Sequence, residues 1–252
     1  MGVVASFLRR VIPARYRPIG YLQHLTRMRT NNCVRSGPFA GVRYVQDSIG
    51  SAYIPKLLGI YESELAEEVE SICSRKPDLI VDIGAAEGYY AVGLAVRNPS
   101  ARVVAFETQP TGQAALREMA RLNRVSSRVE VRGKCEPIHL TEVLTQTNAP
   151  AILCDVEGYE DRLLDPQAVP ALAKATILVE LHDFIVPGIT ETLRKRFSTT
   201  HHLTHISQRT RSRKQFPWRT LATGLLPNSY LDWSVSEWRP ARMAWLWMVP
   251  YG

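Results

Sequence analysis

The sequence lacks two features that would set it apart from ordinary globular proteins. It has no apolar run long enough to cross a bilayer, and its four cysteines are far apart and form no C-x-x-C pair. An integral membrane protein, a zinc site of paired cysteines and a disulfide framework are therefore not expected. Hydrophobic residues make up 45% of the 252 positions and charged residues 22%, which is ordinary for a globular chain. We expect a soluble protein in a reducing, cytoplasmic setting.

Acidic residues are absent from two long stretches of the chain. Residues 1–46 contain eight arginines and no acid, and residues 192–219 contain eight lysines or arginines and again no acid. The net charge of the whole chain is +7. Such basic flanks fit an anionic partner such as nucleic acid, membrane headgroups or a phosphorylated substrate. Solvated basic surface that aids solubility is the more ordinary explanation.

The first residues, MGVVASFLRRVIPARYRP, have no basic stretch ahead of their apolar one, so a secretory signal is not expected. They match a myristoylation pattern, and apolar residues recur at helical spacing between positions 4 and 12. This spacing predicts a short amphipathic helix on a membrane or, as we favour, on the protein's own surface. Proline and glycine are frequent up to position 61. We assign residues 1–61 to a basic arm or partial lid, and residues 62–252 to one main domain.

From residue 62 onward, strand and helix patterns alternate. The predicted strands are short, β-rich segments at residues 79–83, 102–106, 128–131, 151–155 and 176–181. The predicted helices cover a segment from residue 62 onward and residues 89–97, 111–124, 140–144, 158–172 with an interruption at Pro166, and 189–197. The segments HHLTHIS and RMAWLWMV predict a terminal hairpin. Together these patterns predict a doubly wound α/β fold with a mainly parallel sheet.

The stretch LIVDIGAAEGYYAVGLA predicts a strand, a turn and a helix whose N-terminus offers free N–H groups to a nucleotide. The turn lacks the second glycine of the G-x-G-x-x-G pattern, through which a pyrophosphate approaches the backbone. Asp82 and Glu87 would also repel a pyrophosphate. A cationic ligand is favoured, and S-adenosylmethionine is one. Glu107 ends the second predicted strand, where a carboxylate can accept ribose hydroxyls, as it also does in NAD sites.

Four segments occur in the order and spacing of class I S-adenosylmethionine-dependent methyltransferases. They are VDIGAAEGYYAVGLA, VVAFETQP, ILCDVEGYE and ILVELHDF. They resemble the FkbM-like branch in particular, because DVEGYE matches its D-x-E-G-x-E segment, although Thr108 replaces a proline of its E-P-x-P-like segment. The resemblance covers about residues 78–184. It implies a Rossmann-like seven-strand sheet with an antiparallel last strand, and makes 62–252 the methyltransferase domain.

The resemblance also implies where the methyl donor binds. Glu107 would hold the ribose, and Glu136, after the third strand, would lie by the adenine. The methionine part would be lined by residues of the first turn and the helix after it: Asp82, Gly84, Ala85, Gly88 and Tyr89.

Ionisable residues gather where the fourth and fifth predicted strands end, which is where ligands bind in open α/β sheets. Methyl transfer to a hydroxyl needs the acceptor's proton removed, and we take Asp155, Glu157 and His182 as catalytic candidates. His182 could be the base. Alternatively, these three residues and Asp183 could hold a magnesium ion that lowers the acceptor's pKa. A purely structural explanation, with acids favouring a helix N-terminus, stays open as well.

Tryptophans fall into two groups. Trp245 and Trp247 lie in the last predicted strand, and we expect them in the core. Trp218, Trp233 and Trp238 lie in a basic, proline-containing segment, where they could form an aromatic wall for a substrate or simply pack against the protein.

Three functions fit these observations. The leading hypothesis is an O-methyltransferase acting on a hydroxyl of a small molecule, such as a sugar or a secondary metabolite. The second is an RNA methyltransferase that uses the basic flanks, although the fourth strand ends in D-V-E-G and not in the N-P-P-Y-like segment of enzymes that methylate base amines. The third is a binding module without catalysis, against which the intact donor motif argues. The sequence names neither the acceptor nor the oligomeric state.

Overall fold

The computed structural model describes residues 17–46, 48, 52–145 and 147–251. The amphipathic helix expected between positions 4 and 12 lies outside these residues. The chain divides into two compact units. The first comprises the described residues up to Tyr61 together with Arg209–Trp238, and the second comprises Glu62–Gln208 with the residues from Arg239 onward. The expected main domain, 62–252, thus includes a segment, Arg209–Trp238, that clusters with the N-terminal residues.

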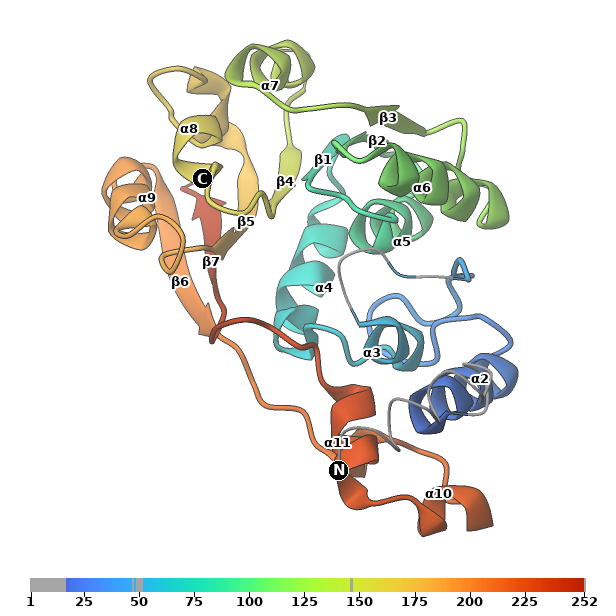
Figure 1. The fold of residues 1–252 in the computed structure, drawn as a ribbon. Coiled ribbons are helices and arrows are strands. Elements are labelled where there is room, and N and C mark those ends of the chain that lie inside the picture. The colour runs from blue at the N-terminus through green and yellow to red at the C-terminus, as the bar shows by residue number, and fades with distance from the viewer. Residues whose placement is uncertain (1–16, 47, 49–51, 146, 252) are drawn as a thin grey trace. The chain divides into compact units, whose positions relative to one another are not determined.

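A seven-stranded sheet forms the centre of the second unit (Figure 1). Its strand order is β3-β2-β1-β4-β5-β7-β6. The first five strands pair in parallel, and β7 runs antiparallel to both β5 and β6. The strands are β1 Leu79–Ile83, β2 Arg102–Phe106, β3 Val129–Arg132, β4 Pro150–Cys154, β5 Thr176–Leu181, β6 His201–Ser207 and β7 Ala244–Pro250. The expected doubly wound fold and the terminal hairpin are confirmed.

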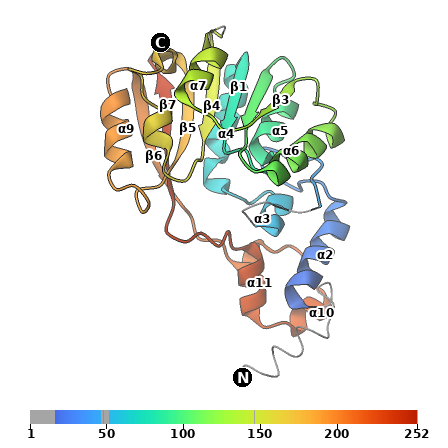
Figure 2. The ribbon, with the colours of Figure 1, turned by 45° about the horizontal axis from the view of Figure 1, so that its top comes forward.

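Helices cover both faces of this sheet (Figure 2). The helix α5 packs against β1 and β2, while α6 packs against β3. Because side chains alternate along a strand, Leu79, Val81 and Ile83 of β1 share the core with apolar residues of α7 and α9. The helices of this unit are α4 Ala66–Arg75, α5 Tyr89–Arg97, α6 Pro110–Leu122, α7 Pro137–Leu144, α8 Glu160–Leu163 and α9 Ile189–Phe197. Trp245 and Trp247 are buried in β7, as expected for core residues.

The helix expected over residues 158–172 with an interruption at Pro166 is broken there as predicted, but its helical parts are shorter than predicted. Only α8, Glu160–Leu163, is helical, and a 3-10 turn follows at Pro170–Lys174. Pro166 has no N–H to donate, and the Asp165 carboxylate accepts a hydrogen bond from the Gln167 N–H instead. Both effects stop the helix early.

The first unit contains more regular structure than its weak periodicity predicts. It consists of α2 Pro18–Thr30, α3 Tyr53–Leu58, α10 Leu221–Leu225 and α11 Asn228–Val235. A proline at the first position of α2 and a left-handed Asn31 just after it mark the helix ends. The helices α2, α3 and α11 share a small core with Phe216; its residues are Leu22, Ile54, Leu58, Phe216, Leu231 and Val235. Within the described residues, no helix is both long enough and apolar enough to cross a membrane.

Candidate active site

The turn after β1 is tied to the ends of two neighbouring strands. The N–H groups of Gly84 and Ala85 both donate to the carbonyl of Phe106 at the end of β2, at 2.9 and 3.0 Å. Gly84 has a φ of +86°, and a Cβ atom there would lie 1.7 Å from the backbone oxygen of Asp155, which follows β4. A side chain is therefore excluded at Gly84 by both backbone conformation and space. Glycine brings the first turn and the fourth strand end together.

Two acidic side chains at this turn are buried. Asp82 and Glu87 are 5% and 0% exposed. Gly88, with a φ of +92°, leads into α5, whose first residue Tyr89 is buried. Two buried carboxylates at this turn disfavour an anionic ligand and favour a cationic one.

Glu107 is held in one orientation at the end of β2. Its Oε2 accepts a hydrogen bond from the Ala86 N–H at 2.8 Å, and its Oε1 accepts one from the Gln109 N–H at 2.6 Å. The absence of a side chain at Gly112 makes room for it, because a Cβ there would lie 2.8 Å from the Glu107 Cγ. A carboxylate has about four lone-pair positions, so two acceptor positions remain for ligand hydroxyls.

Glu136 stands at the start of α7. Its carboxylate accepts a hydrogen bond from the Tyr159 hydroxyl at 2.7 Å and pairs with Lys134 Nζ at 2.5 Å. These two partners hold the pKa of Glu136 below its usual range. Its placement beside an adenine stays a prediction.

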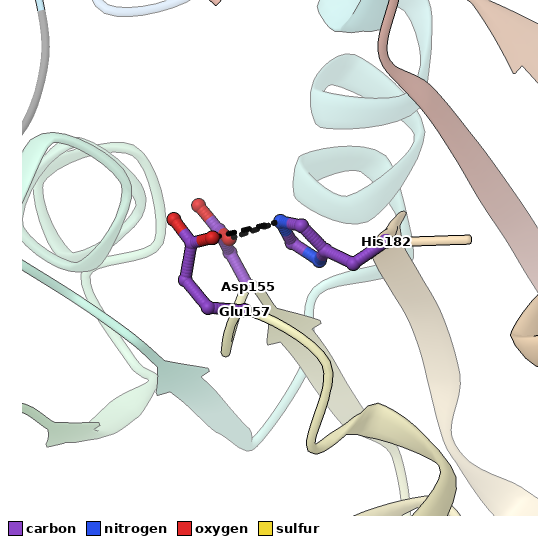
Figure 3. A group of neighbouring side chains, drawn as sticks. All are labelled: Asp155, Glu157 and His182. Atoms are coloured by element: carbon purple, nitrogen blue, oxygen red, sulfur yellow. Dashed lines mark ion pairs between the residues drawn. The ribbon is translucent and has the colours of Figure 1, made fainter. Parts of the chain in front are cut away.

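The structure brings Asp155, Glu157 and His182 together (Figure 3). The His182 Nε2 lies 3.6 Å from Asp155 Oδ1 and 3.8 Å from Glu157 Oε2. Each of the three residues offers one possible ligand atom, and these atoms all lie within 4.8 Å of one another. These distances are too long for hydrogen bonds and leave space for an atom bound between the groups.

The ring of His182 is held from its other side by Glu160. His182 Nδ1 donates to Glu160 Oε1 at 2.6 Å, and both side chains are buried. The same Oε1 accepts the N–H groups of Val156 and Gly158. With its proton on Nδ1, a neutral His182 presents the Nε2 lone pair to Asp155 and Glu157.

Asp183 does not join this group. Its Oδ1 accepts the N–H groups of Gly188 and Thr190, and its Oδ2 accepts the Thr190 hydroxyl. These residues begin α9, so the carboxylate serves the helix N-terminus, where acids are stabilised. The proposed magnesium ligand set therefore shrinks to three residues.

The surroundings raise the pKa values of two of the candidates. Burial and the charge of Glu62 raise the pKa of Asp155 and outweigh its hydrogen bond with Glu180. For His182, burial favours the neutral form, but the hydrogen bond that its ring donates to Glu160 and the charges of the nearby carboxylates outweigh burial and raise its pKa. Asp155 is thus a stronger base than an ordinary aspartate.

Asp155 is hydrogen-bonded to a buried network of charged residues that the sequence motifs do not reveal. Glu180, at the end of β5, shares a hydrogen bond with Asp155, and burial together with the charges of Asp155 and Glu62 raises the pKa of Glu180 to about 11. Arg239 Nη1 pairs with Glu180 at 2.8 Å, and Arg239 Nη2 pairs with Glu62. The Tyr90 hydroxyl donates to Glu62 at 2.5 Å. Glu62 and Arg239 lie 177 positions apart in the sequence, so only the fold shows that they meet.

The sequence matches no protein-family model and no curated protein. Similar solved structures include an O-methyltransferase from Bacillus cereus in complex with SAH, with 11% identity over 98% of this chain and 96% of that chain and a TM-score of 0.48. The O-methyltransferase TomG from Streptomyces achromogenes, in complex with SAM, has 10% identity over 99% and 96%, with a TM-score of 0.48. The tRNA methyltransferase TrmK from B. subtilis has 12% identity over 73% and 65%, with a TM-score of 0.43.

At such identities and scores, these likenesses establish no activity for this chain. The strand order and the antiparallel β7 are what define the architecture. The fold is a Rossmann-like, doubly wound α/β fold whose seven-stranded sheet carries an antiparallel β7.

Proposed function

We propose that this chain is an S-adenosylmethionine-dependent methyltransferase that methylates a hydroxyl of a small molecule, such as a sugar or a secondary metabolite. The observation that carries the proposal is the position of His182, whose Nε2 faces Asp155 and Glu157 beside the turn after β1. The FkbM-like resemblance of the four sequence motifs supports the same assignment.

The donor-binding residues fit S-adenosylmethionine by the chemistry of their side chains. The two buried acids of the first turn, Asp82 and Glu87, suit a ligand with a positive sulfonium and ammonium group. Glu107 has acceptor positions left for the two ribose hydroxyls. When bound, this donor supplies a methyl group on a positively charged sulfur.

The acceptor hydroxyl would lie between Asp155, Glu157 and His182. Asp155, whose pKa is raised, or the neutral Nε2 of His182 takes the proton of the acceptor oxygen, which then forms its bond to the methyl carbon. The electron pair of the broken carbon–sulfur bond stays on the sulfur. Glu160 is a positioning residue in this scheme because it acts through His182.

The same three ligand atoms also fit a divalent cation such as magnesium. Two carboxylates and an imidazole fixed by a buried carboxylate form an ordinary donor set for such an ion. An ion held there would lower the pKa of an acceptor hydroxyl. Loss of turnover on chelation, with recovery on added magnesium, would favour this route over the histidine or aspartate base.

We favour a small-molecule acceptor over RNA because Asp155, Glu157 and Glu160 place three carboxyl groups around the candidate methyl-transfer position. A phosphate backbone would be repelled there. The RNA alternative rests on the basic residues outside this site.

The double variant Asp155→Asn, His182→Gln tests the proposed function. It removes both candidate bases and nearly keeps the shapes of the side chains, so turnover should fall by about a hundredfold or more, while donor affinity changes less than about twofold. Transfer of labelled methyl groups from S-adenosylmethionine to pooled hydroxylated metabolites and to total RNA measures the first quantity, and calorimetry measures the second. Label that appears only in RNA, or turnover that survives in the variant, would contradict the proposal.

A further inference from the structure

Exposed apolar side chains gather on the segment 221–238 of the first unit. Leu221 is 92% exposed and Leu225 is 86% exposed, and Tyr230, Trp233 and Trp238 are exposed as well. These five are nearly half of the eleven exposed large hydrophobic residues in the part of the chain that the structure describes. They come from α10, α11 and the residues just after α11, the orange-red part of the ribbon (Figure 1). We call these five residues the apolar patch.

The fold of the first unit does not need this patch. The inward side of α11 supplies Leu231 and Val235 to the small core, whereas Leu221 and Leu225 of α10 are absent from it. Leu221 and Leu225 are four positions apart on one helix, so they share a face. Thr220, the residue just before α10, caps the helix through a reciprocal pair of hydrogen bonds with Thr223, which orders this short helix.

The two tryptophans of the patch are ordered as a pair. The ring centroids of Trp233 and Trp238 are 3.9 Å apart at an interplanar angle of 35°. Trp238 Nε1 donates to the carbonyl of Trp233 at 2.9 Å. Trp238 thus has a partner for its ring N–H while both tryptophans stay exposed, an amphipathic arrangement that suits a boundary between water and an apolar medium.

The unit that carries the patch is strongly basic. Residues 1–61 and 209–238 contain fourteen lysines and arginines, nine in the first range and five in the second, and three acids, Asp47, Asp232 and Glu237. Asp232 already pairs with Arg213, and Glu237 with Arg211. The formal excess is therefore eleven positive charges, which calls for an anionic partner.

We propose that the apolar patch docks on the surface of a lipid bilayer that contains anionic lipids. Two almost fully exposed leucines gain free energy by entering an acyl region, tryptophans prefer the headgroup level, and the surrounding cations are attracted to anionic headgroups. RNA offers no apolar phase for the leucines. A second copy of the chain would bring the same positive charge to the patch and would be repelled. Residues 1–16 hold Arg9, Arg10 and Arg15 and no acid, so they would be repelled as well.

Vesicle co-sedimentation of the full chain tests the proposal. We expect binding to vesicles of phosphatidylcholine and phosphatidylglycerol in equal parts, weakening with salt, and much weaker binding to phosphatidylcholine alone. The double variant Leu221→Ser, Leu225→Ser should bind the anionic vesicles more weakly than the parent, by a factor of at least about ten. Ile138→Ser, at a 70% exposed position outside the patch, is the matched control and should bind as the parent does.

Quenching of tryptophan fluorescence by brominated lipids measures membrane contact in the parent protein, without substitution of the leucines. Anionic vesicles carrying bromine on their acyl chains should quench the parent protein, and the double variant Trp233→Phe, Trp238→Phe should lose most of that quenching. Failure of the parent to bind anionic vesicles would overturn the proposal, and so would equal binding of the leucine variant. Two other results would overturn the proposal. The first is light scattering that shows a dimer in the parent and a monomer in the leucine variant, and the second is vesicle binding that occurs only after residues 1–16 are removed.

The outcome is independent of the proposed methyl transfer, because none of the patch residues belongs to the candidate active site.

Discussion

Glu160 is a fully buried carboxylate that accepts hydrogen bonds from His182 and from two backbone N–H groups. Its sequence segment, DVEGYE, predicts a site at the end of the fourth strand, but not that Glu160 would orient His182. That role depends on the chain turning back after β4, where Glu157 and Gly158 have φ values of +53° and +96°. The neighbours Asp155, Glu157 and His182 could be predicted, because residues that follow adjacent parallel strands share one sheet edge.

Gly84 is a second residue whose role is set by local geometry. Gly84→Ala would place a Cβ 1.7 Å from the Asp155 backbone oxygen, at a φ that side chains rarely adopt. We expect the free energy of unfolding to fall by at least about 2 kcal/mol. Denaturant unfolding measures it.

The matched control for that substitution is Gly133→Ala. No atom lies within 4 Å of a Cβ built there, so its free energy of unfolding should change by less than about 0.5 kcal/mol. Equal stability of Gly84→Ala and the parent would show that the turn does not press against the end of β4.

Among the elements, strands were easier to predict than helices. β1, β2 and β5 begin and end where the sequence predicts, because strands buried on both faces are mostly apolar. For residues 158–172 the interruption at Pro166 was predicted, but the helix ends earlier, at Leu163, because the Asp165 carboxylate accepts the Gln167 N–H and forms a turn there. The α2 helix is not predicted because its apolar residues recur only weakly at helical spacing. Its buried side includes Thr26, which donates a hydrogen bond to the Leu22 carbonyl.

β6 carries a buried histidine that should make folding pH-dependent. His201 is 1% exposed, its Nε2 donates to the Ala175 carbonyl at 2.9 Å, and burial lowers its pKa. Since the unfolded chain binds the proton more readily than the folded one, the stabilisation is present above about pH 6.5 and is lost as the pH falls below it.

His201→Gln should therefore flatten the fall in the free energy of unfolding between about pH 6.5 and pH 5. Thermal unfolding across this range measures the slope. His205→Gln, at an exposed position of the same strand, is the control and should leave the slope as in the parent. An unchanged slope in His201→Gln would assign the acid sensitivity to other groups.

At the scale of the whole molecule, the two units have different surface chemistry. Every residue placed in the candidate active site belongs to the second unit, including Glu62 and Arg239 of the buried network. The first unit carries the apolar patch and a large excess of positive charge. The basic flanks seen in the sequence therefore need not describe the methyl acceptor, and the donor site can be tested separately from them.

Calorimetric titration of the full chain with S-adenosylmethionine tests the central claim most directly. The account predicts one binding site per chain, and an affinity roughly tenfold to a hundredfold lower in Glu107→Ala, because the ribose hydroxyls lose a charged acceptor. Glu130→Ala, at a partly exposed carboxylate on the neighbouring β3, should bind as the parent does. An absence of binding by the parent, or undiminished affinity in Glu107→Ala, would contradict the account.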